Sequence, residues 1–340
     1  MAPLRLLTAL TTAVLAAASP ARAAAPAPST RVELTLVSYA VAKPLFAKLI
    51  PEFQRAWREQ TGQEVRFKES YGPSGAQTRS ILGGLDADVY ATNLQTLIPP
   101  LVDAGIVKAG WETRLPSGAS PASSVIAIIV RGGNPKKIQG WQDLAVPGID
   151  VVAINPKTSG NARWGVLAGY GAVLRDQGAS AADAWVRALV KNTKTLASGG
   201  REATDAFVKN GVGDALLTFE NEAVFASKVT GEPIDYVVPQ SNVRTDFPVV
   251  MVDRVVDKKG TRAVAEAFAK FLFSPKAQAI YAEAGYRPAD VAGAKAAAGK
   301  LRPVPKLFAV DDVGGWAKID RALFADGALY DQAQAARGGR

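Results

Sequence analysis

The sequence predicts an α/β protein of two lobes, each with a mainly parallel sheet flanked by helices and with a ligand cleft between them. Short β-branched runs alternate with amphipathic stretches along most of the chain. A set of such units, from Asn134 to about Val243, is embedded inside a similar flanking set, which suggests two crossing strands. The length of 340 residues also exceeds the size at which one core usually divides in two.

The predicted strands share alternating or continuous apolar, β-branched residues. They lie at 32–38, 64–70, 88–92, 126–130, 149–154, 214–218 and 236–238. The predicted helices carry apolar residues at helical spacing. They lie at 44–60, 77–82, 164–174, 181–190, 261–272 and 275–284. From the order of these elements, we expect residues 31–125 and 247–335 to form the first lobe and residues 126–246 to form the second.

The first 23 residues are typical of a cleavable export signal. Arg5 precedes the apolar run Leu6–Ala18, and Ala21-Arg22-Ala23 fits a small-residue cleavage site. The apolar run is shorter than the roughly 20 residues that span a bilayer. We therefore expect a signal peptide at 1–23, a disordered leader at 24–30 and a periplasmic protein. An uncleaved membrane anchor is the alternative.

The composition excludes several kinds of site. The chain has no cysteine and no histidine, which excludes disulfides, thiol nucleophiles, Ser-His-Asp catalysis and histidine-based metal sites. Removing the two arginines of the first 23 residues lowers the formal net charge from +9 to +7. The basic residues are dispersed, which is typical of a solvated surface, although the charge also suits an anionic ligand.

Three strand-to-helix junctions share one design, with a small or polar residue at the N-cap, at least one glycine and then a helical run. They lie at 71–77, 155–164 and 197–202. The first N–H groups of a helix have no partner within it, and the helix dipole places partial positive charge there. Taken singly, each junction is also an ordinary capped helix start. Together, the three predict a binding site for an anion with several oxygens.

Other functional interpretations rest on fewer residues. The junctions lack the spacing of a phosphate-binding P-loop, and Ser74 lacks both a nucleophile elbow and a histidine base. An exported carboxylate-based hydrolase would need an acidic pair such as Glu220 and Glu222. Tyr39 and Tyr71 would suit a ferric-iron receptor, which uses tyrosines, but the glycine- and serine-containing junctions favour a bare anion instead. We interpret the tryptophans as residues that pack in the core, and the alternative is that they form a sugar-binding cleft.

Eight short stretches, in order and spacing, resemble the periplasmic sulfate-binding proteins, the substrate receptors of sulfate/thiosulfate ABC importers. The stretches lie at 37–39, 72–75, 155–164, 211–214, 220–223, 274–278, 286–288 and 314–317. The resemblance implies a type II periplasmic-binding-protein fold that closes around dehydrated sulfate. It further implies a non-enzymatic monomer that delivers sulfate to the permease subunits of an ABC transporter, with no cofactor, no metal and no nucleic acid.

The resemblance also assigns positions around the anion. The residues matching direct ligand contacts are Ala40, Ser74, Ser159, Gly160, Asn161, Gly200 and Phe219. Ser74 and Ser159 match the two serine donors, and Ala40, Gly160, Asn161 and Gly200 match backbone donors. Arg163 and Arg201 would neutralise the anion from a second layer, or would form salt bridges at the surface or between the lobes.

Several residues depart from the family pattern. Pro73 replaces a glycine and removes one N–H, Asn161 replaces a second glycine, and Ala40 stands where many members have aspartate. Phe219 stands where sulfate receptors often have a tryptophan whose indole N–H donates to the anion. One lost charge-assisted hydrogen bond costs about 1.5–3 kcal/mol. Because thiosulfate receptors resemble this chain at Phe219, thiosulfate is a second expected ligand.

The donor-only character of the junctions bears on which oxyanion binds. Sulfate carries no proton at neutral pH, whereas phosphate does and favours a carboxylate acceptor. The only acid in the three junctions is Glu202, which we expect to be a first-turn acid of its own helix. The residues therefore favour sulfate, and molybdate, tungstate and phosphate are the alternatives within the same architecture.

Overall fold

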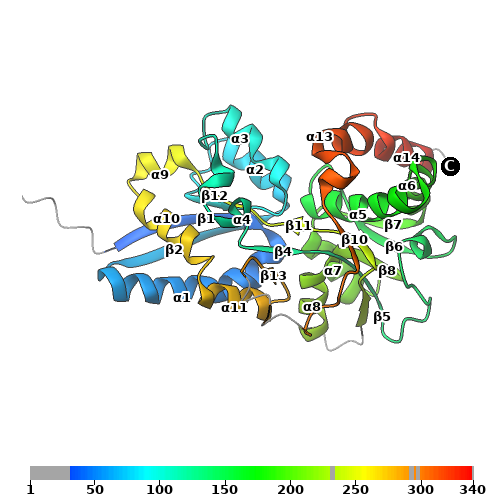
Figure 1. Cartoon of the computed structure of the whole chain (residues 1–340), viewed down its shortest axis with the longest axis horizontal. Helices are drawn as coiled ribbons and strands as arrows, with labels where there is room; N and C mark the ends of the chain where they lie inside the picture. Colours follow the sequence, from blue (N-terminus) through cyan, green and yellow to red (C-terminus); the bar gives the residue numbers. More distant parts are fainter. Residues whose placement is uncertain (1–30, 230–233, 291–294, 296–298, 339–340) are drawn as a thin grey trace, which may run out of the picture.

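A computed structural model describes residues 31–229, 234–290, 295 and 299–338. The predicted signal peptide and leader lie outside the described residues. Two lobes lie side by side, and short strands connect them in the middle of the molecule (Figure 1). Within the described ranges, we find no helix with the length and hydropathy to cross a membrane.

The first lobe contains a four-stranded sheet in the order β12-β3-β1-β2. Its strands are β1 (Arg31–Tyr39), β2 (Glu64–Gly72), β3 (Val89–Ala91) and β12 (Val249–Met251). The first three run parallel and β12 runs antiparallel to β3. The helices of this lobe are α1 (Lys43–Thr61), α2 (Ser74–Leu82), α3 (Pro99–Asp103), α4 (Pro116–Ala119), α9 (Asp253–Lys259), α10 (Arg262–Phe271) and α11 (Pro275–Glu283).

The second lobe contains a five-stranded sheet in the order β7-β6-β8-β5-β9. Its strands are β5 (Ile126–Arg131), β6 (Val151–Ile154), β7 (Thr193–Ala197), β8 (Ala215–Phe219) and β9 (Ile234–Val237). Its helices are α5 (Gly160–Gln177), α6 (Ala179–Asn192), α7 (Gly200–Val208) and α8 (Glu220–Val229).

The apolar run of β5 is continuous because helices cover both faces of its sheet. Ile128 and Val130 belong to the same core cluster as residues of α5 and α6, whereas Ala127 and Ile129 belong to the cluster that contains residues of α7 and α8. Successive side chains of a strand point to opposite faces, so an apolar residue is needed at every position. This pattern explains why the run at 126–130 lacks the alternation of an exposed sheet.

Three short strands connect the lobes. Strand β4 (Ala122–Ser124) pairs antiparallel with both β11 (Thr245–Asp246) and β13 (Arg287–Pro288). The first two are the crossing strands that the embedded unit predicts. The third precedes a further passage of the chain to the second lobe, where β14 (Lys306–Phe308) pairs with β10 (Ser241–Val243). The prediction of two crossing strands is therefore wrong, because three strands connect the lobes.

The end of the chain packs on the second lobe. The predicted boundary instead assigned residues 247–335 to the first lobe. After β14 come η5 (Val310–Val313), α13 (Gly315–Ile319), η6 (Asp320–Phe324) and α14 (Leu329–Gly338), the last of which lies against α6 (Figure 1). The physical reason is burial, because Phe308 and Val313 lie against α5 at Gly171. We propose that residues 306–338 belong to the second lobe, and residues 31–122 and 247–288 to the first.

The predicted strands and helices are present, with differences at the junctions. Helix α2 begins at Ser74 and α5 at Gly160, several residues before the predicted starts at 77 and 164. Helices α8, α9 and α14 and strand β7 were among the elements not predicted. The earlier starts place Ser74, Gly75 and Gly160 in the first turns of the helices, which matters for the site.

The contact of α5 with α6 depends on the absence of a side chain at Gly169. A Cβ atom at this position would overlap the Trp185 ring, which is held by a 2.7 Å hydrogen bond to the Trp141 carbonyl oxygen. We predict that Gly169→Ala lowers the free energy of unfolding by about 1–3 kcal/mol in urea denaturation. In the control, Gly165→Ala, the added Cβ lies at least 3.7 Å from Leu217. Equal stabilities of the two variants would contradict this packing.

Candidate functional site

Three helix starts meet where the two lobes touch. Helices α2, α5 and α7 follow the carboxyl ends of β2, β6 and β7, and the short turn η1 (Ala40–Ala42) follows β1. Carboxyl ends of parallel strands share one edge of a sheet, so each lobe presents its helix starts at the edge facing its partner. We call the residues at these starts, together with Ala40, the cradle. They are Ala40, Ser74, Ser159, Gly160, Asn161 and Gly200.

In the described structure, none of the N-cap residues of the cradle helices caps its own helix with a side chain. The residues before α5 and α7, Ser159 and Gly199, have extended backbones, and neither accepts a capping hydrogen bond. Pro73 occupies the same position before α2. The first-turn N–H groups of Gly75 and Gly160 donate to the opposite lobe. First-turn N–H groups that lack a partner are free to donate to a ligand, and the helix dipole makes these ends attractive to anions.

The cradle is closed by direct contacts between the lobes. The Gly160 N–H donates to the Ser74 hydroxyl oxygen at 2.9 Å, and the Gly75 N–H donates to the Thr158 carbonyl oxygen at 3.1 Å. Ser74 is 1% exposed and Ser159 is 4% exposed. The two serines that the sequence singled out therefore lie buried at the interface of the lobes, one from each side.

Asn93 is a residue at the cradle that the sequence did not single out. It follows β3, at the same sheet edge as Ala40, and its carbonyl oxygen accepts the Trp164 indole N–H at 2.6 Å. Its side-chain oxygen lies directly against Gly160, where a Cβ atom would overlap it. A signal was available, since Asn93 comes directly after a predicted strand. The close approach of the lobes thus requires glycine at 160.

Phe219 ends β8 and is completely buried in an aromatic cluster. Its ring is perpendicular to that of Phe247, with the centroids 5.0 Å apart, and Phe247 stacks on Tyr39 at 5.6 Å. The Tyr39 and Tyr286 hydroxyls form a 3.3 Å hydrogen bond. Burial raises the pKa of Tyr39 far above its usual value, so this hydroxyl stays neutral. Phe219 forms an apolar wall in this cluster.

Arg163 and Arg201 each pair with a carboxylate of the second lobe. The Arg163 guanidinium lies 2.9 Å from Asp320, and its Nε donates to the Pro156 carbonyl oxygen at 3.0 Å. The Arg201 guanidinium lies 3.2 Å from the Glu222 carboxylate. Of the two roles that the sequence left open, the structure shows these salt bridges, which do not cross between the lobes.

The acidic pair Glu220 and Glu222 diverges. Glu220 contacts the Arg287 guanidinium at 2.6 Å and accepts the Arg302 N–H at 3.0 Å. Glu222 accepts the Thr204 hydroxyl at 2.7 Å and pairs with Arg201. Burial raises the pKa of Glu220, and it raises that of Glu222 to about 7 against the opposing effect of Arg201. Each carboxylate is thus engaged by different partners, unlike a catalytic pair.

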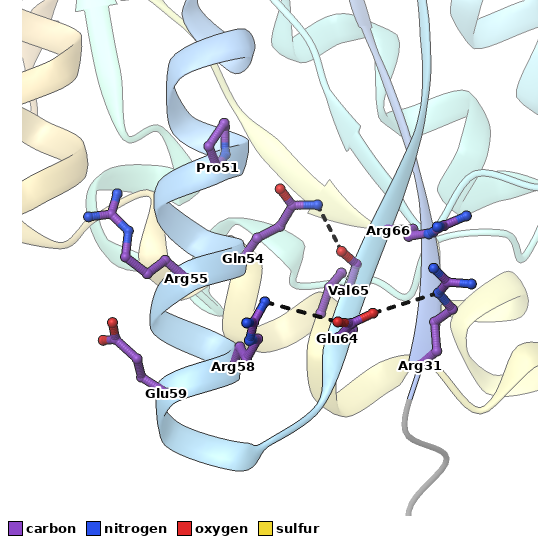
Figure 2. A pocket seen from close by; sticks show the side chains of 9 residues that line it. All are labelled: Arg31, Pro51, Gln54, Arg55, Arg58, Glu59, Glu64, Val65 and Arg66. Atoms are coloured by element: carbon purple, nitrogen blue, oxygen red, sulfur yellow. Dashed lines mark hydrogen bonds and ion pairs between the residues drawn. The ribbon is translucent and has the colours of Figure 1, made fainter.

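A hollow lies at the opposite end of the first lobe from the cradle. Figure 2 shows this groove of about 620 Å³ between α1 and the beginnings of β1 and β2, lined by four arginines and two glutamates. Arg31 and Arg58 approach the Glu64 carboxylate at 3.9 and 4.0 Å, and both side chains are more than half exposed. Exposed pairs of this kind contribute little, and the groove lacks the buried donors of the cradle.

Comparisons with known proteins identify the family of this chain. The family model of the bacterial extracellular solute-binding proteins matches residues 34–287. The sulfate-binding protein of Synechococcus elongatus is 45% identical over 313 residues, which cover 91% of this chain and 88% of that protein. The chain belongs to the family of bacterial extracellular solute-binding proteins. The resemblance seen in the sequence motifs is thereby confirmed.

Other relatives of this chain are named either sulfate-binding or thiosulfate-binding proteins. The sulfate-binding protein of Escherichia coli is 40% identical and the alignment covers 88% of this chain and 92% of the relative. The thiosulfate-binding protein of Pseudomonas aeruginosa is 39% identical, with coverages of 87% and 90%. The structure of the sulfate-binding protein SubI from Mycobacterium tuberculosis is 36% identical and matches with a TM-score of 0.79, covering 86% of this chain and 99% of SubI. The expected type II fold is confirmed.

The raised pKa of Glu222 predicts a specific pH dependence of stability. Its folded pKa of about 7 exceeds the ordinary 4.5, so the folded protein binds more protons between these values and loses stability as the pH rises through them. Between pH 5 and pH 8, we expect the free energy of unfolding of the isosteric variant Glu222→Gln to fall by about 2–4 kcal/mol less than that of the wild type. Urea unfolding at the two pH values, with exposed Glu59→Gln as control, measures it. Identical pH dependence of Glu222→Gln and wild type would contradict the assignment.

Proposed function

We propose that the protein is a non-catalytic receptor that binds sulfate between its lobes and delivers it to an ABC importer. The closed cradle is the observation that carries this proposal. Buried serine hydroxyls and uncapped helix starts from both lobes meet at one point, where the Gly160 N–H already reaches the Ser74 hydroxyl. The three relatives named sulfate-binding proteins support the same ligand.

The chemistry of the cradle favours an anion without protons. Backbone N–H groups and serine hydroxyls can all donate, and each hydrogen bond to a charged group contributes about 1.5–3 kcal/mol. Glu202, the one acid in the three junctions, accepts the Ser198 N–H at 3.0 Å at the start of its own helix, as expected. No carboxylate of the junctions therefore serves as an acceptor for a protonated oxyanion such as hydrogen phosphate.

Thiosulfate is the second candidate, and Phe219 is the observation that favours it. The Phe219 ring offers no N–H donor, and it packs on Phe247 as part of an apolar wall. The terminal sulfur of thiosulfate is a weaker hydrogen-bond acceptor than oxygen, so it loses less at such a wall. A relative at 39% identity carries the name thiosulfate-binding protein.

The remaining parts of the proposal concern location and partners. The first 23 residues have the pattern of a cleaved signal peptide, which fits a periplasmic receptor. We propose that the closed, monomeric receptor meets the permease subunits of an ABC transporter. Family membership supports a transport partner of this kind.

Isothermal titration calorimetry of the protein lacking residues 1–23 tests the ligand. We predict micromolar or tighter binding of sulfate or thiosulfate. Ser159→Ala should weaken binding by tenfold or more, because a buried donor to a charged ligand is lost. Arg163→Ala should weaken it less, because Arg163 is paired with Asp320.

Two outcomes would contradict the proposal. No heat with either anion at micromolar concentration would exclude sulfate and thiosulfate, and titration with molybdate, tungstate and phosphate would then identify the ligand. Equal losses in Ser159→Ala and Arg163→Ala would show that charge, and not hydrogen bonding, dominates the affinity.

A further inference from the structure

The side chain of Asn161 joins three elements of the second lobe at the cradle. Asn161 is the second residue of α5 and is 1% exposed. Its Nδ2 donates to the Thr218 hydroxyl at 3.0 Å, directly before Phe219 at the end of β8. The same nitrogen lies against Gly200, the first residue of α7. One buried carboxamide thus contacts the starts of α5 and α7 and the end of β8.

Gly200 leaves the space that this carboxamide fills. A Cβ atom at position 200 would lie 2.8 Å from Asn161 Nδ2 and 3.1 Å from Val41 Cγ1 in the first lobe. The first distance is shorter than a non-bonded contact allows, so alanine at 200 would displace the carboxamide from Thr218. The asparagine at 161 therefore requires glycine at 200.

The hydrogen bonding of Asn161 does not suit a residue that serves folding alone. Its side-chain oxygen is buried and has no hydrogen-bond partner among the described residues. Burying an unpartnered carbonyl oxygen lowers stability, and such an exception in a native fold needs an explanation. The explanation we offer is that the carboxamide is retained because it holds three elements, α5, α7 and β8, in their arrangement.

We propose that Asn161 is a positioning residue, whose carboxamide sets the spacing between the starts of α5 and α7 and the end of β8. This role is separate from the backbone N–H that the sequence singled out. The inference rests on the proposed function, because the spacing of these elements would determine how tightly the oxyanion binds. It extends the function to a residue pair in which the carboxamide of Asn161 requires glycine at position 200.

A double-mutant cycle measured by calorimetry with sulfate and thiosulfate tests the proposal. Asn161→Ala should weaken binding about fivefold, the loss expected for one neutral hydrogen bond. Gly200→Ala should weaken it about tenfold or more, since the added Cβ displaces the carboxamide. The double variant should bind about as well as Asn161→Ala, because removal of the carboxamide makes room for the Cβ and the end of the Val41 side chain, 3.1 Å away, needs to move only by a few tenths of an ångström.

Thr218→Val provides a second route that keeps the side-chain shape. It should cause the same loss as Asn161→Ala, and combining the two should add nothing further. The unliganded Tm separates positioning from folding, because a positioning role changes affinity while the Tm of Asn161→Ala stays within about 2 °C of wild type. Gly165→Ala in the same helix, whose Cβ would meet only Leu217 at ordinary distance, should bind like the wild type.

Additive losses in the cycle, or wild-type affinity in Gly200→Ala, would overturn the proposal. A fall in Tm that matches the loss of affinity in Asn161→Ala would do the same, because it would show a role in folding. The wild-type titration distinguishes this failure from failure of the proposed function. A wild type that binds while the cycle is additive overturns the positioning role only, and a wild type that binds neither anion overturns both.

Discussion

The hydrogen bond from the Gly160 N–H to the Ser74 hydroxyl joins the lobes at the point where three helix starts meet. A dianion moved from water to this place must replace its hydration with donors from the protein. Uncapped helix starts provide such donors in fixed directions without adding a positive side chain. The sheets, junction glycines and crossing strands all serve to bring these starts together.

The C-terminal segment holds the junction before α5 from the outside. The Lys157 ammonium donates to the Phe324 carbonyl oxygen at 2.8 Å and contacts Asp326 at 3.1 Å and Asp331 at 2.9 Å. Arg163, on the next turn, pairs with Asp320. Lys157 and Arg163 are thus bound by the C-terminal segment and stabilise the loop that carries Ser159.

The fold could be predicted from the sequence where local pattern decides it. The continuous apolar run of β5 indicates that helices cover both faces of its sheet. The glycines at the junctions indicate that another part of the protein approaches the backbone closely there. Long-range choices could not be predicted. No local pattern tells that α14 packs on α6, that Asp320 pairs with Arg163, or that the Asn161 carboxamide reaches Thr218. Roles of Ser74 and Phe219 required the family resemblance.

The most direct test of the central claim is the response of individual backbone amides to sulfate in an NMR titration. Donation of an N–H to an anion moves its proton resonance downfield. The account predicts the largest downfield shifts at Gly160, Asn161 and Gly200, which lie on the second-lobe side of the interface, opposite Ser74 of the first lobe. Largest shifts instead at the arginine-lined groove around Arg31 and Arg66 would contradict it, because the anion would then bind as a surface counterion.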